Sequence, residues 1–543
     1  IDEGLVGSEM CIRDRIKEFL FFFLLLMYKK TMGGGLMQLV AYGAQDVYLT
    51  GNPQITFWKV TYRRHTNFAM ESIEQTFNGQ ADFGRRVTCT VSRNGDLAYR
   101  TYLQITLPEI GQTLANDSGG DVYARWLDFP GHQLIENVEV EIGGQRIEKQ
   151  YGDWMHIWCQ LTMPGNQWSG YNKMIGNTTQ LTFVTDPSYA DVDGPCDSDA
   201  PRQVCAPRNA LPETTLYIPL QFWFCSNPGL ALPLIALQYH EVKINLDLRA
   251  IDECLWAVSD LAAGGEKVSA AYSQSLVSAS LYVDYIYLDT DERRRMAQNP
   301  HEYLIEQLQY TGAESVGSSA NKIRLNFNHP CKELVWVVQP DCHVDYCASL
   351  TGGELLFNAL GAQPFNFSDA VDALPNSLKA FGGAAAVEGT AAFIGAEDLF
   401  ESPNANDAGT QSAVSDAGTF VLAETSLHMH CWGDNPVVTA KLQLNGQDRF
   451  SEREGGYFDK VQPWQHHSRS PDTGINVYSF ALRPEEHQPS GTCNMSRIDN
   501  ATLQLVLSNA TVEGTNTAKV RVYATNYNVL RIMSGMGGLA YSN

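Results

Sequence analysis

Much of the chain alternates apolar and polar residues with a period of two, which is typical of β-strands that have one buried face. Residues 86–91, 102–107 and 138–142 show this pattern, and in the last segment the valines and the isoleucine share one face while the glutamates share the other. Further strands are predicted over residues 216–224, 241–249, 280–288, 322–327, 334–339, 437–444, 477–482 and 519–529. The pattern therefore indicates an all-β chain.

The strand pattern occurs twice, because short segments of the first half recur in the same order in the second half. The recurring pairs are SIEQ at 72–75 with LIEQ at 304–307, VEIGGQ at 140–145 with LQLNGQ at 442–447, GDW at 152–154 with GGY at 455–457, and VKINLDL at 242–248 with ATLQLVL at 501–507. Their spacing varies, as expected if two copies of one fold differ in loop length. Gly143-Gly144 and Asn445-Gly446 occupy matching positions and suit hairpin turns. We predict two antiparallel β-sandwiches, each of about 220 residues and about eight strands.

Two segments predict short helices instead. From Trp154 to Leu161, four large apolar residues recur at i, i+3, i+4 and i+7, the pattern of an amphipathic helix. Residues 291–297 place acids first and bases later, which matches the helix dipole, and Pro300 ends this helix. We place the linker between the two sandwiches there.

Two long stretches interrupt the strands. Residues 160–212 are rich in Gly, Asn, Asp and Pro, and residues 348–419 are rich in Ala, Gly, Asn, Asp and Ser. Neither composition suits a core, so we predict that both are surface loops.

Composition narrows the function classes. The 543 residues are 44% hydrophobic and 18% charged, which supports a large core and excludes an intrinsically disordered chain. The net charge of −23 would repel phosphate groups, so the bulk surface is not expected to bind nucleic acid. The net charge does not exclude a local basic patch. The 12 cysteines include no CxxC pair. Free thiols in a reducing compartment are the favoured interpretation, with an extracellular disulfide framework as the alternative.

The first 31 residues differ from the remainder. Residues 19–27 are apolar but too short to span a membrane, and no small-x-small cleavage site follows them. The upstream string GLVGSEMCIRDR resembles translated adaptor sequence. We expect the working protein to start at Met32 and residues 1–31 to be an artefactual leader.

Three histidine-containing segments are candidate sites of chemistry. His428-x-His430 with Asp434 resembles a cupin metal site, but the acid is Asp instead of Glu and no third histidine is placed on a matching strand. The adjacent His466 and His467 would point in opposite directions on an extended chain. Residues 485–487 (Glu-Glu-His) lie between two prolines with no nucleophile or oxyanion donor nearby. We therefore assign no catalytic, cofactor-binding or metal residue.

Six Asn-x-Ser/Thr tripeptides are potential sites of N-glycosylation. Asn116, Asn177 and Asn366 lie in or beside the predicted loops, and three others lie at 494, 500 and 509. The tripeptide alone does not show whether Asn116, Asn177 or Asn366 carries a glycan.

Several motifs resemble a known family. They are GNPQITFWKV at 51–60, LDTDERRR at 288–295, INVYSFAL at 475–482, PEEHQPSG at 484–491 and SGTCNMSRID at 490–499. Together with the duplicated sandwich they resemble the major capsid protein of large nucleocytoplasmic DNA viruses, in the branch of phycodnaviruses, mimivirus relatives and iridoviruses. The resemblance runs from Met32 to about Ser534 in both halves; the leading 31 residues depart from it.

The resemblance implies two tandem eight-stranded jelly-roll sandwiches with long loops and a few short helices. The expected organisation is a leader at 1–31, an N-terminal arm at 32–66, a first jelly roll at 67–290, a linker at 291–300, a second jelly roll at 301–533 and a tail at 534–543. It also implies a non-enzymatic subunit of the virion that trimerises into pseudo-hexameric capsomers of an icosahedral shell. The implied partners are neighbouring capsomers, minor capsid proteins and an internal membrane, with assembly in the host cytoplasm and no direct nucleic-acid binding.

A jelly-roll carbohydrate-binding protein or a cupin-like enzyme is the alternative, because a fold alone does not fix a function. The large aromatics near predicted turns and loops favour a subunit with interfaces. They are Trp126, Phe129, Trp168, Phe222, Trp223 and Trp464. We expect them to lie in contacts between copies of the chain.

Overall fold

The computed structural model describes residues 34–111, 114, 122–182, 210–259, 265–346, 361–369 and 433–541. The chain divides into two compact units, Ile1–Thr66 and Asn67–Asn543. In the first unit, the helices α2 (Gly34–Val40) and α3 (Val47–Thr50) bury no residue. None of the helices in the described ranges has the length and apolar character needed to cross a membrane.

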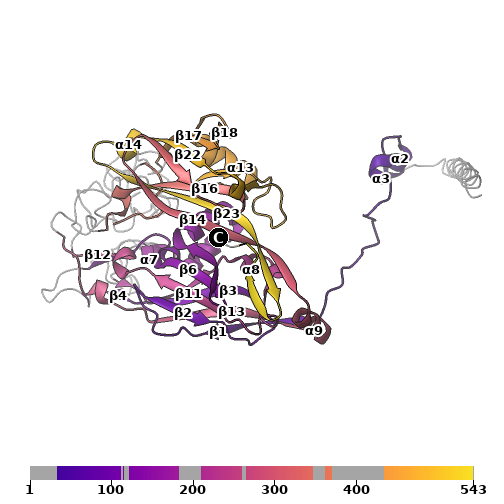
Figure 1. The fold of residues 1–543 in the computed structure, drawn as a ribbon, viewed down its shortest axis with the longest axis horizontal. Helices are drawn as coiled ribbons and strands as arrows, with labels where there is room; N and C mark the ends of the chain where they lie inside the picture. The colour runs from indigo at the N-terminus through magenta and orange to yellow at the C-terminus, as the bar shows by residue number, and fades with distance from the viewer. Residues whose placement is uncertain are drawn as a thin grey trace, which may run out of the picture. The chain divides into compact units, whose positions relative to one another are not determined.

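The second unit begins with a jelly roll of two antiparallel sheets (Figure 1). One sheet has the order β1–β13–β3, with β9 and β10 pairing different parts of β3 and filling one strand position. The other has the order β2–β11–β6–β7. Their bounds are β1 (Phe68–Gln75), β2 (Arg86–Thr90), β3 (Leu97–Leu107), β6 (Ile135–Ile142), β7 (Gln145–Tyr151), β9 (Thr214–Pro219), β10 (Leu232–Pro233), β11 (Val242–Leu248) and β13 (Ser278–Leu288). Two small sheets flank this roll, β4 (Ile110–Gly111) with β8 (Ala210–Leu211), and β5 (Tyr123–Trp126) with β12 (Leu255–Val258).

The second jelly roll repeats this plan. One sheet has the order β14–β23–β16–β20, and the other has the order β15–β22–β17–β18. The short strands β21, β19 and β24 pair with β16, β17 and β23. Their bounds are β14 (His301–Val316), β15 (Ala320–Leu325), β16 (Pro330–Pro340), β17 (Val437–Leu444), β18 (Gln447–Asp448), β19 (Arg453–Glu454), β20 (Asn476–Ser479), β21 (Cys493–Asn494), β22 (Ala501–Leu507), β23 (Ala518–Met533) and β24 (Met536–Leu539).

The two strand orders confirm the duplication. Each recurring strand segment of the sequence falls on strands with matching sheet positions: β1 with β14, β6 with β17, and β11 with β22. The turn between β6 and β7 at Gly143-Gly144 therefore matches the turn between β17 and β18 at Asn445-Gly446. All four turn residues have positive φ, which explains why glycine and asparagine stand there.

A helical segment follows each matched hairpin, and in both halves it starts next to a glycine with no room for a side chain. A Cβ on Gly152 would lie 2.1 Å from the Ile135 carbonyl oxygen, and one on Gly455 would lie 1.8 Å from the Val437 carbonyl oxygen. Ile135 and Val437 are the first residues of the matching strands β6 and β17. The glycines thus let each helix start directly against the backbone of its own sheet.

The helices correct part of the loop prediction. α5 (Gly152–Thr162) and α9 (Thr290–Gln298) lie where the sequence predicted helices. Residues 160–212, however, contain α6 (Gly165–Ile175) and α7 (Thr179–Thr182), and Tyr171 and Ile175 of α6 are buried. The predicted strand at 216–224 ends at Pro219, and its last residues enter α8 (Trp223–Ser226). The remaining helical elements are α4 (Pro130–Leu134), α13 (Gln462–His466), α14 (Asn509–Val512), η3 (Pro228–Leu230), η4 (Ile251–Glu253), η5 (Ala271–Ser273), η6 (Asp341–Val344), the π-helical turn η11 (Tyr457–Val461) and η12 (Met495–Arg497).

Each roll has its own apolar core, but the long strands of the second roll also reach the first. Ile305, Leu530 and Ile532 of β14 and β23 belong to the core of the first roll. The turn after β23 is bound there as well, since Tyr239 N–H donates to the Gly535 carbonyl at 3.0 Å. Figure 1 shows β14 and β23 running beside the strands of the first roll.

Candidate functional site: the joint between the two jelly rolls

The helix α5 lies between the two jelly rolls and contacts both. Met155 points into the core of the first roll and is fully buried. Trp154, Ile157 and Leu161 instead belong to a separate apolar cluster with residues of the second roll. Those residues are Val335 and Val337 of β16, Val477 of β20, Tyr523 of β23, and Phe365, Phe367 and Ile475. We call this contact, with α5 at its centre, the joint.

Aromatic rings make up much of the joint. Trp154 lies 5.2 Å from Tyr523 between ring centroids, and Tyr523 stacks on Tyr310 of β14 at 4.8 Å. Tyr310 meets Tyr151 edge-on, also at 4.8 Å. Offset and edge-on pairs of this kind add about 0.5–1.5 kcal/mol each beyond the area that they bury. The joint therefore resembles a protein core more than a hinge.

A buried ion triad crosses the joint. Asp153, in the first turn of α5, accepts hydrogen bonds from Arg249 of the first roll at 3.0 Å and from Arg521 of β23 at 2.7 Å. The three side chains are between 12% and 18% exposed. Burial by itself raises the pKa of Asp153, but the two guanidinium groups more than offset this effect and hold the pKa below its usual value. Asp153 thus joins one cation from each roll.

Two neutral histidines lie beside the triad. Burial lowers the pKa of His132 to about 3 and that of His156 well below its usual value. His132 Nε2 lies 2.7 Å from the Tyr171 hydroxyl. The His156 ring packs on Phe365 of the second roll, with 4.3 Å between centroids. Both rings also pack against phenylalanine rings, and protonating either one would place an ion in the aromatic cluster.

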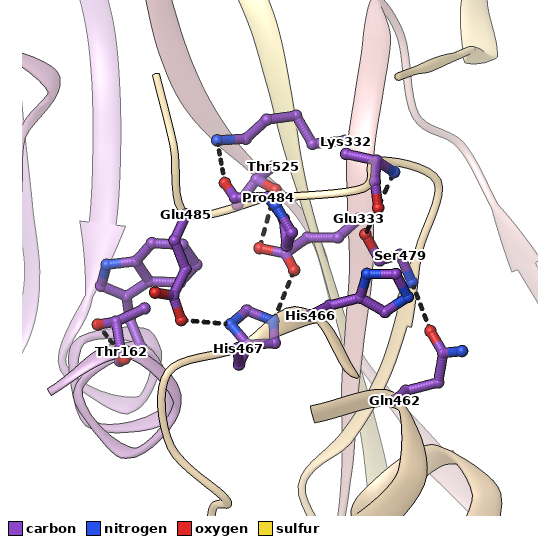
Figure 2. A network of polar contacts seen from close by, with 12 residues as sticks. Thr162, Lys332, Glu333, Gln462, His466, His467, Ser479, Pro484, Glu485 and Thr525 are labelled. Atoms are coloured by element: carbon purple, nitrogen blue, oxygen red, sulfur yellow. Dashed lines mark hydrogen bonds and ion pairs between the residues drawn. The ribbon is translucent and has the colours of Figure 1, made fainter. Parts of the chain in front are cut away.

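Figure 2 shows a second buried network at the edge of the joint, centred on His467. Its Nε2 lies 2.9 Å from a Glu333 carboxylate oxygen, and its Nδ1 lies 3.0 Å from a Glu485 oxygen. Since both partners only accept hydrogen bonds, both ring nitrogens donate and the ring is an imidazolium. Burial by itself lowers the pKa of His467, yet the two carboxylates raise it to about 9. The ring also meets Trp158 of α5 edge-on at 6.2 Å, which connects this network to the joint.

A lysine next to this network is satisfied in the same way. Lys332 is 1% exposed, and its ammonium contacts Glu306 at 2.8 Å and donates to the Pro484 carbonyl at 2.7 Å. His487 lies 3.5 Å from the same Glu306 carboxylate. The segment 484–487 therefore binds β16 from outside: the Pro484 carbonyl accepts from Lys332, and His487 contacts the Glu306 carboxylate that pairs with the same lysine.

The histidines that the sequence offers as candidates for catalysis or metal binding have other partners in the structure, or lie outside the described residues. Ser468 Oγ donates to Glu485 and not to His467, so the imidazole is not placed to activate that hydroxyl. His466 Nδ1 contacts the Leu482 carbonyl oxygen at 3.1 Å. Asp434 donates its N–H to Asp369, whereas His428 and His430 lie outside the described residues. Within the ranges that the structure describes, no group of three or more His, Cys, Asp or Glu side chains could hold a metal ion.

Two of the candidate glycosylation sites are buried. Asn177 is 8% exposed and donates to Asn172 at 3.3 Å. Asn366 is 6% exposed and donates to Gln363 at 2.8 Å. A glycan would have no room on either amide of the folded chain, while Asn116 lies outside the described residues. Seven cysteines in the described part of the chain are free: Cys89, Cys159, Cys225, Cys254, Cys331, Cys342 and Cys493.

The prediction that six loop aromatics form contacts between copies was wrong for most of them. Trp126, Phe129, Phe222 and Trp223 are at most 4% exposed inside the chain. Trp126, Phe222 and Trp223 are buried in the core of the first roll, and Phe129 is buried in the cluster between the two rolls, which a local sequence pattern does not reveal. Trp168 lies in α6 beneath the guanidinium of Arg469, at 3.6 Å from its ring centroid. Trp464 stays 76% exposed.

The sequence reasoning missed the charges of the joint. Asp153 carried a usable signal, because it follows the repeat glycine Gly152, whereas the matching residue after Gly455 is Gly456. A charge present in only one copy of a repeat indicates a contact that only this copy makes. Arg249 and Arg521 gave no comparable signal, since Arg249 ends the predicted strand 241–249 and Arg521 lies inside the predicted strand 519–529.

Comparison with known proteins gives consistent results over both halves. A family model described as major capsid protein N-terminus matches residues 56–289, and one described as large eukaryotic DNA virus major capsid protein matches residues 292–538. The major capsid protein of Phaeocystis pouchetii virus is 77% identical over 523 residues, and that of Chrysochromulina ericina virus is 70% identical over 586 residues. Each alignment covers 94% of this chain and all of the relative.

Solved structures agree. A chain of the Paramecium bursaria Chlorella virus 1 (PBCV-1) capsid, known from a quasi-atomic model, is similar with a TM-score of 0.61 and 35% identity, covering 90% of this chain and all of that one. The Faustovirus major capsid protein has a TM-score of 0.59 at 12% identity, covering 97% of this chain and 98% of that one, and so shows the shared fold alone.

Proposed function

The chain belongs to the family of major capsid proteins of large eukaryotic DNA viruses, and we propose that three copies of it close into a pseudo-hexameric capsomer. As a member of this family it is a structural protein of the virion. Family membership also favours this function over a carbohydrate-binding protein or a cupin-like enzyme.

The observation that carries the proposal is the joint between two jelly rolls of the same topology. Three chains, each with two rolls at a fixed angle, supply six rolls to a ring that needs only threefold symmetry to close. The joint supports a fixed angle, because Asp153 binds a cation from each roll and α5 is buried against both. A duplicated chain of this kind can therefore fill a hexagonal position in a shell.

The proposal includes the surroundings of the capsomer. Capsomers would contact one another in an icosahedral shell assembled in the host cytoplasm, with minor capsid proteins and an internal membrane beneath it. We further propose a non-enzymatic role and the domain bounds expected above, with the linker at 291–300, where α9 joins the two rolls. The arm at 32–66 exposes large apolar residues, among them Phe57, Trp58 and Tyr62, which fits a segment that other proteins cover.

Size-exclusion chromatography with light scattering, followed by electron microscopy of the purified chain, tests the proposal. We expect a mass of three chains and projections with six lobes. A chain that stays monomeric at micromolar concentration and neutral pH would contradict the proposed capsomer.

A further inference from the structure

The segment in the second roll that corresponds to α5 has an exposed side that points away from its own sheet. This segment, Tyr457–His466, comprises η11 and α13 and follows Gly455 as α5 follows Gly152. Counting from the two glycines, Phe458 corresponds to Met155, and both side chains are fully buried in the cores of their own rolls. The two segments therefore sit on their sheets in the same register.

The register also identifies the outward positions. In α5 they are Trp154, Ile157, Trp158 and Leu161, which the second roll covers. In the segment Tyr457–His466 the same count gives Tyr457, which packs partly on the core of its own roll, and Lys460, Val461 and Trp464. Val461 is 38% exposed and Trp464 is 76% exposed. Leu482 is 74% exposed, and its carbonyl oxygen contacts the ring of His466, the last residue of α13. Leu482 therefore lies beside the end of this helix and extends the apolar area. We call Val461, Trp464 and Leu482 the tryptophan patch.

The surface that α5 covers also has a counterpart. In the second roll, α5 covers the outer face of β23, β16 and β20 through Tyr523, Val335 and Val477. The strands in the same sheet positions of the first roll are β13, β3 and β9. Their outer face carries Tyr282, Tyr102 and Tyr217, which we call the tyrosine face. Tyr102 stacks on Tyr282 at 5.1 Å and lies 6.4 Å from Tyr217, which is 41% exposed.

One chain thus holds a complete joint in its middle and the two halves of a second joint on its surface. We propose that the tryptophan patch of one copy packs on the tyrosine face of the next copy, repeating the joint head to tail. This inference rests on the proposed capsomer and names its contact: a heterologous interface that closes a ring after three copies, with a joint inside each chain alternating with a joint between chains. A row of tyrosines suits this role, since it offers both ring surface and hydroxyl groups to a tryptophan.

The charges on the two surfaces have opposite sign. Lys460 is exposed beside the tryptophan patch, and Glu74 and Asp284 lie next to Tyr282, across the strand pair β1 and β13. Among the described residues none of these three charges forms an ion pair with another side chain. An ion pair across the interface would orient the contact more than strengthen it.

Light scattering on purified variants tests the contact from both sides. Trp464→Asp and Tyr282→Asp should each reduce the mass from three chains to one, while Trp464→Phe should keep the full mass. Met536→Asp is the matched control, because Met536 is 52% exposed at the start of β24 and belongs to neither surface, and it should stay trimeric. Circular dichroism confirms that each variant is folded, and Leu482→Asp replaces Trp464→Asp if that chain misfolds.

The outcomes separate this inference from the proposed function. If the unaltered chain is not a trimer, the proposed capsomer is wrong. If the unaltered chain is a trimer and folded Trp464→Asp or Tyr282→Asp remains one, the capsomer stands and this contact is wrong. Loss of the trimer in Met536→Asp as well would also overturn the contact, because any exposed acid would then have the same effect.

Discussion

Replacing Asp153 by asparagine should uncouple the two jelly rolls. The change removes the only negative charge of the ion triad and leaves Arg249 and Arg521 facing each other across the joint at 14% and 18% exposure. Breaking a buried pair by removing one partner costs about 3–5 kcal/mol, because the remaining charge stays buried without compensation. An asparagine oxygen still accepts one hydrogen bond, so we expect a loss near the lower end, about 3 kcal/mol. That is a large part of the roughly 5–15 kcal/mol that stabilises a typical protein.

Urea unfolding followed by tryptophan fluorescence measures this loss, since Trp154 and Trp158 both lie on α5. The unaltered chain should unfold both rolls in one transition, and Asp153→Asn should lower the midpoint and separate a second transition. Both proteins must be compared at one concentration, because any oligomer adds to the apparent stability. Glu486→Gln is the matched control: its pair with Arg483 is 54% and 72% exposed, so it should cost below about 1 kcal/mol.

The double variant Asp153→Asn with Arg521→Gln distinguishes the loss of the interaction between these two residues from a general loss of stability. If the two residues act together, their effects should differ from additivity by about 1–3 kcal/mol. A loss below about 1 kcal/mol for Asp153→Asn, or strictly additive effects, would refute the argument that this charge holds the rolls together.

Three further predictions concern other parts of the molecule. Since the folded pKa of His467 is raised to about 9 from 6.5, its contribution of about 3 kcal/mol should be complete below pH 6.5 and disappear as the pH rises through 9, and His467→Gln should abolish this slope in pH-dependent unfolding. Gly455→Ala should lower the free energy of unfolding in urea by about 1–3 kcal/mol or more, because its Cβ would meet the Val437 carbonyl, whereas Gly456→Ala, with open space around it, should be neutral or slightly stabilising. EDTA should leave the oligomer mass unchanged in light scattering, and dissociation into folded monomers on chelation would show that a metal holds the contact.

Much of the fold could be predicted because it depends on local alternation. The strand at 437–444 was predicted with the bounds that β17 has, and the repeat located the matching turns at Gly144 and Gly446. Strand ends were less predictable: β3 starts at Leu97, five residues before the predicted segment, and β23 continues to Met533. These extensions pair with distant strands, so their length depends on the partner and not on their own residues.

The joint could not be predicted to the same degree, because its burial depends on contacts between halves. The glycines and asparagines of α6 predict a loop, although Trp168, Tyr171 and Ile175 follow a helical spacing that indicates the helix. The composition of residues 348–419 predicts a surface loop, yet Phe365 and Phe367 are buried against His156 of α5, and Phe365 also meets Phe129. Their flanking residues are small and polar, so only the helices that they cover explain why they lie inside.

The stiffness of the joint has a consequence for shell geometry. With α5 packed on both sandwiches and Asp153 binding each of them, the angle within one subunit does not adjust to its position in a shell. A closed shell must nevertheless be flat across its facets and bent along its edges. The bending therefore has to be absorbed where neighbouring capsomers meet, by shallow contacts that tilt at little cost. In such a shell the subunits behave as rigid plates. The elastic compliance of the particle then comes from the contacts between capsomers, and the particle should first open at these contacts under pressure.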